Sequence, residues 1–213
     1  LNTNLYIIKE KACQFHSKIL ISKKDLQNNC SCDFIYGTLS KGLLIVYTGN
    51  GKGKTTAAIG SAMRAVGQGL SVLMLQFIKG SWKYGELESV KRMQPDFEIQ
   101  ALGKGFVRSN SKLDDNEVKE NISRSWERAK NAIFSDRYDM IILDEINYVI
   151  GYGLLPVEEV LTILGKRPER LHIIMTGRDV HERVIEKADL VTEMREIKHP
   201  YSKGVKAQKG IEF

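Results

Sequence analysis

The residues best suited to chemistry lie between Leu43 and Thr56, in the stretch LLIVYTGNGKGKTT. An apolar run leads into a loop with three glycines, and a lysine and two threonines follow. Glycines let the backbone turn with positive φ and approach a ligand closely, and N–H groups at a helix N-terminus bind anions. Lys54 adds a point charge, and the Thr55 hydroxyl is suited to ligate Mg²⁺. The stretch predicts a phosphate-binding loop; the simpler alternative is a glycine-rich turn before an ordinary helix.

This loop departs from the common phosphate-loop pattern at one position. The pattern G-x-x-x-x-G-K-[ST] requires glycine at position 48, where Thr48 stands. Counted from Gly49, the loop is one residue short. Because a shorter loop wraps fewer phosphates in the usual way, the nucleotide need not bind in the usual pose.

A second chemical signal is the acidic pair Asp144-Glu145, which follows the apolar run 138–143. In nucleotide-binding enzymes a carboxylate at the end of a buried strand holds Mg²⁺ opposite the loop hydroxyl. Alternation along a strand would put the two carboxylates on opposite sides, and the sequence leaves open which of them faces the metal. The simpler interpretation is a strand-end carboxylate that caps a turn.

Three further side chains have two open interpretations each. Arg178 follows the apolar run 171–175, where it could pair with a phosphate or lie as an ordinary surface arginine in a turn. Trp82 and Phe106 stand in glycine-containing loops. Each could form an apolar wall for a large flat ligand or pack under its own loop.

The strands and helices that must position these residues alternate along the chain. This alternation predicts an α/β fold with a mostly parallel sheet and helices on both faces, and ligands bind at the carboxyl ends of the strands in such a sheet. We expect strands at 43–47, 71–77, 97–102, 138–143, 171–175 and 190–197, helices at 54–66, 114–134, after Pro156 and at 180–188, and ligand-end loops at 78–86 and 103–108.

Composition narrows the class of protein. The chain has 213 residues, and no apolar run in it approaches the roughly 20 residues that span a bilayer, so we expect no membrane partner. Its net charge of +6 is scattered rather than clustered, which argues against a nucleic-acid partner. The three cysteines all fall within the first 32 residues, which favours incidental thiols in a reducing compartment such as the cytoplasm over half of a metal site. The polar, weakly periodic residues 1–41 are expected to form an N-terminal arm outside a domain at 42–213.

Several of these stretches, in this order, resemble one enzyme family. The chain is similar from about residue 42 to its C-terminus to the P-loop-type ATP:cob(I)alamin adenosyltransferases, and this resemblance implies a P-loop NTPase-like (RecA-like) fold. The stretches that carry it are TGNGKGKTTAA (48–58), QFIKG (76–80) with Trp82 and Gly85-Glu86, Gly105-Phe106, Leu143-Asp144-Glu145, LLP (154–156) with Glu158-Glu159, Thr176-Gly177-Arg178 and GVKAQ (204–208).

The resemblance implies a reaction and roles for particular residues. Cobalt(I) of a corrinoid attacks the 5′ carbon of ATP and triphosphate leaves, so the substrate itself supplies the nucleophile and the protein aligns the ligands. ATP lies reversed in the family's short loop, which gives a reason for the missing glycine. The implied assignments are the triphosphate on Gly49, Asn50, Gly51, Lys52, Gly53, Lys54, Thr55 and Thr56, Mg²⁺ or Mn²⁺ on Thr55 and Glu145, the corrinoid on Trp82, Phe106 and Arg108, and catalytic roles for Lys54 and Phe106.

The resemblance also implies partners for the protein, and the sequence differs from the family pattern in two places. An electron-donating reductase or flavodoxin-like protein and a homodimer are implied, and the family's aromatic matched by Phe106 helps to expel the lower axial ligand of cobalt. The family often has tryptophan where Arg108 stands, and its N-terminal helical arm has no clear match in residues 1–41. Two other functions remain open: an ATPase or kinase acting on the γ-phosphate, on nucleic acid or another acceptor, and a nucleotide-binding regulator without catalysis.

Overall fold

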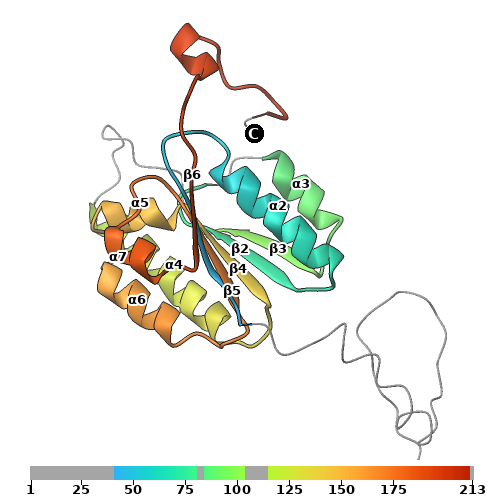
Figure 1. Cartoon of the computed structure of the whole chain (residues 1–213), viewed down its shortest axis with the longest axis vertical. Helices are drawn as coiled ribbons and strands as arrows, with labels where there is room; N and C mark the ends of the chain where they lie inside the picture. Colours follow the sequence, from blue (N-terminus) through green and yellow to red (C-terminus); the bar gives the residue numbers. More distant parts are fainter. Residues whose placement is uncertain (1–40, 81–83, 104–114, 212–213) are drawn as a thin grey trace, which may run out of the picture. The chain divides into compact units, whose positions relative to one another are not determined.

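A parallel sheet forms the centre of the unit that begins at Lys41 (Figure 1). The structure, a computed structural model, describes residues 41–80, 84–103 and 115–211, and residues 41–213 form one compact unit. All of the strand pairs are parallel, which confirms the predicted α/β class. The strands are β1 (Leu44–Thr48), β2 (Val72–Gln76), β3 (Phe97–Ala101), β4 (Met140–Asp144), β5 (His172–Thr176) and β6 (Leu190–Glu193), in the order β3-β2-β4-β5-β1-β6.

Helices cover both faces of this sheet, and two apolar cores result (Figure 1). On one face α2 packs through the small side chains Ala58, Ala62 and Ala65, which let its backbone come close to the strands. On the other face α4 buries Trp126 and Ile133. One face carries α2 (Lys54–Gly67) and α3 (Gly85–Lys91), and the other carries α4 (Asp115–Ile133), α5 (Ile146–Gly151), α6 (Val157–Gly165) and α7 (Glu182–Lys187).

Most of the predicted elements are confirmed to within a few residues, but two helices were missed and one strand was overlong. The helices α3 and α5 have seven and six residues, too few turns to show a clear apolar period. The strand predicted over 190–197 ends at Glu193, because the chain then leaves the sheet edge. A short 3₁₀ helix, Pro200–Lys203, follows it.

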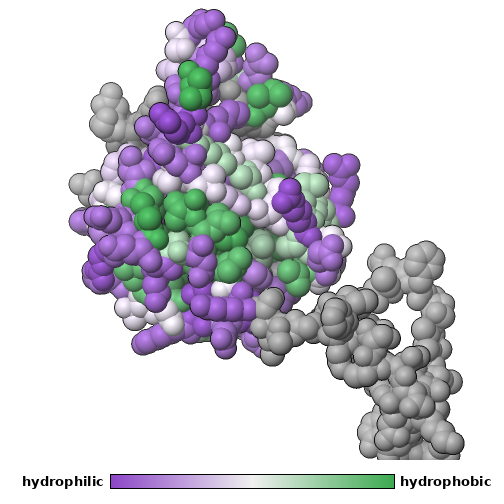
Figure 2. Space-filling view, in the orientation of Figure 1, coloured by the Kyte–Doolittle hydropathy of each residue, from purple (hydrophilic) through white to green (hydrophobic). Residues whose placement is uncertain are grey.

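The two edges of the sheet differ in exposure. β6 is exposed along all four of its residues, including Leu190 and Val191, whereas Phe97 at the start of β3 is fully buried. Figure 2 shows an apolar area on the face where Figure 1 places β6. Among the described helices, none combines the length and apolar character that a bilayer-spanning segment requires.

Candidate functional site

The glycine loop joins β1 to α2 at the carboxyl end of the sheet. Gly49 and Gly53 adopt positive φ of 94° and 120°, which favours glycine. Thr48 is the last residue of β1, and its carbonyl accepts a hydrogen bond from Met194 N–H at 2.8 Å. Position 48 therefore belongs to the strand, and its backbone does not need the conformational freedom of glycine.

The segment that follows β6 packs against this loop. Gly51 N–H donates to the Met194 carbonyl at 2.6 Å. A Cβ atom at Gly49 would lie 2.4 Å from the same carbonyl oxygen, so only glycine fits there without displacing the backbone. The loop is consequently held between α2 and the chain that leaves the sheet edge.

The side chain of Lys54 bridges two carbonyl groups of the glycine loop. It is buried, and its Nζ donates to the carbonyls of Gly49 at 2.7 Å and Gly51 at 2.8 Å. Burial lowers the pKa of Lys54, while the charge of Glu145 opposes that shift. Thr55 and Thr56 follow in the first turn of α2, so the predicted nucleotide-binding residues 49–56 form one continuous loop–helix junction.

Asp144 is the most buried carboxylate of the site, with no exposed surface. Its Oδ1 accepts hydrogen bonds from Thr55 Oγ1 at 2.9 Å and Thr176 Oγ1 at 2.7 Å, and Gln76 Nε2 donates to Oδ2 at 3.4 Å. Three donors from three elements therefore converge on this one side chain. The Thr55 hydroxyl, which gives its hydrogen to Asp144, keeps its lone pairs for another partner.

Glu145 lies just beyond the end of β4 and turns sharply. Its φ of 64° and ψ of 19° are left-handed and β4 ends at Asp144, so the alternation of a strand does not govern the placement of these two carboxylates. Glu145 Oε2 is buried and has no hydrogen-bond partner. Burial of the carboxyl group is the main cause that raises the pKa of Glu145 to about 7, and the charge of Asp144 adds to the shift. The charge of Lys54 opposes it.

A divalent cation fits this arrangement. Oxygen ligands from carboxylates and hydroxyls are those that Mg²⁺ and Mn²⁺ prefer. The unpartnered Glu145 Oε2 and the outward lone pairs of Thr55 are such ligands, close to a second carboxylate, Asp144. The residues present are therefore compatible with the predicted metal pair, Thr55 and Glu145.

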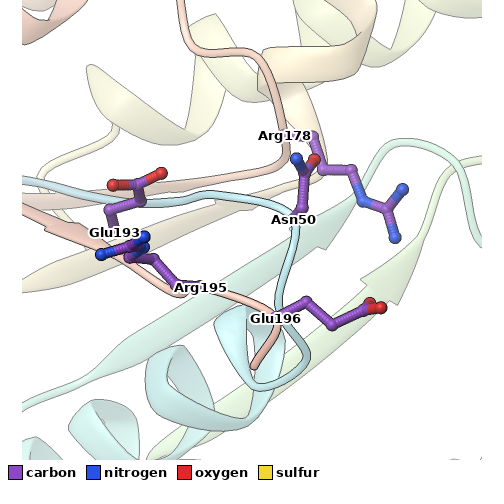
Figure 3. Close-up of a pocket in the computed structure, with 5 residues that line it drawn as sticks. All are labelled: Asn50, Arg178, Glu193, Arg195 and Glu196. Atoms are coloured by element: carbon purple, nitrogen blue, oxygen red, sulfur yellow. The ribbon is translucent and has the colours of Figure 1, made fainter. Parts of the chain in front are cut away.

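A pocket of about 350 Å³ opens beside the glycine loop. Figure 3 shows Glu193 beside Arg195 at one end, and Asn50 near Arg178 toward the other. Of the lining residues, the sequence had singled out Asn50 and Arg178 only. The pocket is lined by Asn50, Arg178, Glu193, Arg195 and Glu196.

The predicted corrinoid residues Trp82, Phe106 and Arg108 lie outside the described residues. The described part of the loop after β2 is held by Lys79, whose Nζ forms an ion pair with Glu86 Oε1 at 2.8 Å and lies 4.6 Å from the centre of the Tyr84 ring. This contact ties the end of β2 to the start of α3.

Sequence reasoning quoted two polar side chains, Gln76 and Thr176, within its motifs but gave neither of them a role. Gln76 and Thr176 are the last residues of β2 and β5, and both are fully buried. A polar residue inside an apolar run such as SVLMLQF is a usable signal, because burying a polar group without a partner is costly. That Asp144 is the partner of both side chains became visible only once the strand order was known.

Comparison with known proteins identifies the family. The sequence profile described as "ATP:corrinoid adenosyltransferase BtuR/CobO/CobP" matches residues 40–213. The corrinoid adenosyltransferase of Escherichia coli K12 is 43% identical over 173 residues, 81% of this chain and 86% of that protein. Corrinoid adenosyltransferase CobA of Salmonella typhimurium is 41% identical over the same shares, and the corrinoid adenosyltransferase of Sinorhizobium sp. is 42% identical over 83% of this chain and 82% of that protein. The chain belongs to the ATP:corrinoid adenosyltransferase family.

Proposed function

We propose that this chain transfers the 5′-deoxyadenosyl group of ATP to the cobalt(I) of a corrinoid and releases triphosphate. One observation carries the proposal: Lys54, Thr55 and the Asp144–Glu145 pair meet at one end of the sheet in a chain that matches this family over residues 40–213. The cobalt–carbon bond forms with the electron pair of cobalt(I). The C5′–O bond breaks, and the triphosphate leaves with the two electrons of that bond.

The protein's task in this reaction is alignment and charge stabilisation. The loop N–H groups of residues 49–53, apart from that of Gly51, and the buried ammonium of Lys54 would bind the triphosphate, on which negative charge develops as it leaves. Fixed charges in a dry site stabilise such a leaving group more strongly than water does. Lys54 is therefore the catalytic residue among those that the structure describes.

Thr55 and Glu145 would hold Mg²⁺ or Mn²⁺ in this scheme. Such a cation, when bound, neutralises part of the triphosphate charge. Support comes from the unpartnered, buried Glu145 Oε2 and from the Thr55 hydroxyl, whose hydrogen is engaged by Asp144. Asp144 already accepts three hydrogen bonds, so its role in this proposal is to orient Thr55.

The pocket beside the loop is suited to the sugar end of ATP. The carboxylates of Glu193 and Glu196 offer acceptors for ribose hydroxyl groups, and Asn50 joins the pocket to the loop. Arg178, on the same pocket, brings a planar guanidinium within range of the charges of Lys54 and Glu145. We assign it to the phosphate chain.

The corrinoid roles follow from the family resemblance. Phe106 would form the apolar wall that helps to expel the lower axial ligand, with Trp82 and Arg108 as further corrinoid contacts. Because cobalt(I) must be generated by an external electron donor, the scheme includes a reductase or flavodoxin-like partner. A homodimer and a cytoplasmic location complete the proposal.

The decisive experiment identifies which bond of ATP is broken. The protein is incubated with MgATP and chemically reduced cob(I)alamin, and the products are followed by visible absorbance and phosphate analysis. A light-sensitive cobalt–carbon product and stoichiometric triphosphate are expected. ADP and phosphate alone would instead support the ATPase or kinase alternative, and unchanged ATP with tight binding would support a regulator.

The role of Phe106 has its own test. In Phe106→Ala we expect a larger loss of rate when the assay starts from cobalt(II) than when it starts from pre-reduced corrinoid, because loss of the axial ligand makes cobalt(II) easier to reduce. The measurement is the initial rate of cobalt–carbon bond formation in both assays. Equal losses in the two assays would contradict the assigned role.

A further inference from the structure

Thr176, the last residue of β5, is fully buried, and its hydroxyl makes two hydrogen bonds. Oγ1 donates to Asp144 Oδ1 at 2.7 Å and accepts from the Glu145 backbone N–H at 2.9 Å. One oxygen atom thus joins the end of β5 to both carboxylate residues at the end of β4. No role in the reaction has yet been assigned to it.

The second of these bonds supports an unusual backbone. Glu145 has a φ of 64°, a conformation that a residue with a long side chain adopts at a cost unless its surroundings hold it there. It precedes the first residue of α5, and no side-chain hydrogen bond caps that helix. Thr176 Oγ1 provides the acceptor that the Glu145 N–H would otherwise lack in this part-buried turn.

The residues next to Thr176 leave little freedom for this contact to shift. Gly177 has a φ of 132°, and a Cβ atom there would lie 2.9 Å from Asn147 Cβ. Asn147 Nδ2 also donates to the Gly177 carbonyl at 3.4 Å. The end of β5 is therefore packed directly against the start of α5, and the Thr176 hydroxyl is fixed relative to Glu145.

We infer that Thr176 is a positioning residue for the divalent-cation site. Its hydroxyl orients the Asp144 carboxylate, which in turn orients the Thr55 hydroxyl, and it holds the left-handed turn that directs the Glu145 side chain toward the cation. Both cation ligands therefore depend on one oxygen atom that does not itself touch the cation. The inference rests on the proposed function, in which Thr55 and Glu145 are those ligands.

Three variants test this inference. Thr176→Val keeps the shape of the side chain and removes both hydrogen bonds, whereas Thr176→Ser keeps the hydroxyl. Thr162→Val is the matched control, because the Thr162 hydroxyl donates to the Glu158 carbonyl on the exposed face of α6. The readout is Mn²⁺ affinity in the presence of ATP, measured by electron paramagnetic resonance, beside ATP affinity without any metal.

Loss of an outer partner of a metal ligand typically costs about 10- to 100-fold in metal affinity. We expect Thr176→Val to weaken Mn²⁺ binding by roughly this factor while metal-free ATP affinity stays within about twofold. Thr176→Ser should stay close to wild type, and Thr162→Val should match wild type. Thr176→Ala carries the same expectation as the valine variant and decides the matter if valine prevents folding.

Two results would overturn the inference. One is Mn²⁺ binding by Thr176→Val or Thr176→Ala as tight as that of Thr162→Val. The other is an equal loss of Mn²⁺ affinity in Thr176→Ser, because the hydroxyl would then be irrelevant. Failure of the wild-type protein to form the cobalt–carbon product is a separate result, which would count against the proposed function itself.

Discussion

The two ends of the parallel sheet treat their polar groups in opposite ways. At the amino end, Arg170 donates to Asp136 and Asp139 side-chain oxygens at 2.6 Å each, and to the Tyr138 carbonyl at 3.2 Å. Asp139 also accepts from the backbone and hydroxyl of Ser71. Charges at this end are matched by partners within the chain.

At the carboxyl end, buried polar atoms are left without partners. Across the described part of the chain, the buried side-chain atoms without a hydrogen bond are Gln76 Oε1, Glu145 Oε2 and Asn147 Oδ1, and all three lie at this end. Such atoms cost stability in a free protein. One end of the sheet therefore holds the fold together, while the other keeps polar groups available to bind ligands.

The strongest test of this contrast is Lys54→Ala. It should lower kcat for adenosyl transfer at least about 100-fold, or ~3 kcal/mol, because a charge that stabilises the leaving triphosphate is lost. The free energy of unfolding in urea should change far less than this activation free energy. Initial rates with cob(I)alamin and urea unfolding measure the two effects, with Lys166→Ala, at the exposed end of α6, as control. A variant with normal kcat would show that the carboxyl end does not act through this lysine.

A second test uses the raised pKa of Glu145, about 7 in the folded protein against a usual 4.5. The folded state then holds this proton more tightly, so the free energy of unfolding falls as the pH rises from about 5 to 8 in the absence of metal and nucleotide. Glu145→Gln should lack that fall and be more stable at pH 8 by about 2 to 3 kcal/mol.

Urea unfolding across this pH range compares Glu145→Gln with wild type, and Glu186→Gln, an exposed carboxylate on α7, is the control. Parallel curves for wild type and Glu145→Gln would mean that ionisation of Glu145 does not lower the free energy of unfolding. The same substitution should weaken Mn²⁺ binding, so that stability and ligand binding change in opposite directions.

The glycine loop and most of the fold could be predicted from the sequence, because the signals for them are local. The glycine loop and Lys54 lie within one continuous stretch, and the strands were predictable because runs buried on both faces are nearly all apolar. The apolar stripe of α4, which includes Trp126, repeats at the helical period. These features need no knowledge of how the elements pair.

The other contacts of the site depend on pairing between strands that are distant in the sequence. Gln76 lies opposite Asp144 in the β2–β4 register, and Glu193 lies opposite Thr48 in the β1–β6 register, which brings Met194 onto the glycine loop. Neither neighbour is encoded by local spacing. The left-handed turn at Glu145 likewise needs Thr176 from β5, 31 residues away along the chain.

A third test addresses the amino end. Arg170→Met removes hydrogen bonds to two carboxylates and two carbonyls, and should lower the free energy of unfolding by about 2 kcal/mol without changing kcat. Lys91→Met, which removes only the exposed ion pair with Glu88, should cost less than about 0.5 kcal/mol. A loss of activity without loss of stability in Arg170→Met would break the division between the two ends.

The smallest expected effect concerns Arg178, which lies at the carboxyl end but is exposed. If it binds the phosphate chain, Arg178→Ala should raise the dissociation constant for ATP about fivefold, or ~1 kcal/mol, and leave stability unchanged. Arg183→Ala, which removes a surface pair with Glu158, is the control. Equal ATP affinity in both variants would make Arg178 an ordinary surface arginine and would remove it from the groups assigned to the phosphate chain.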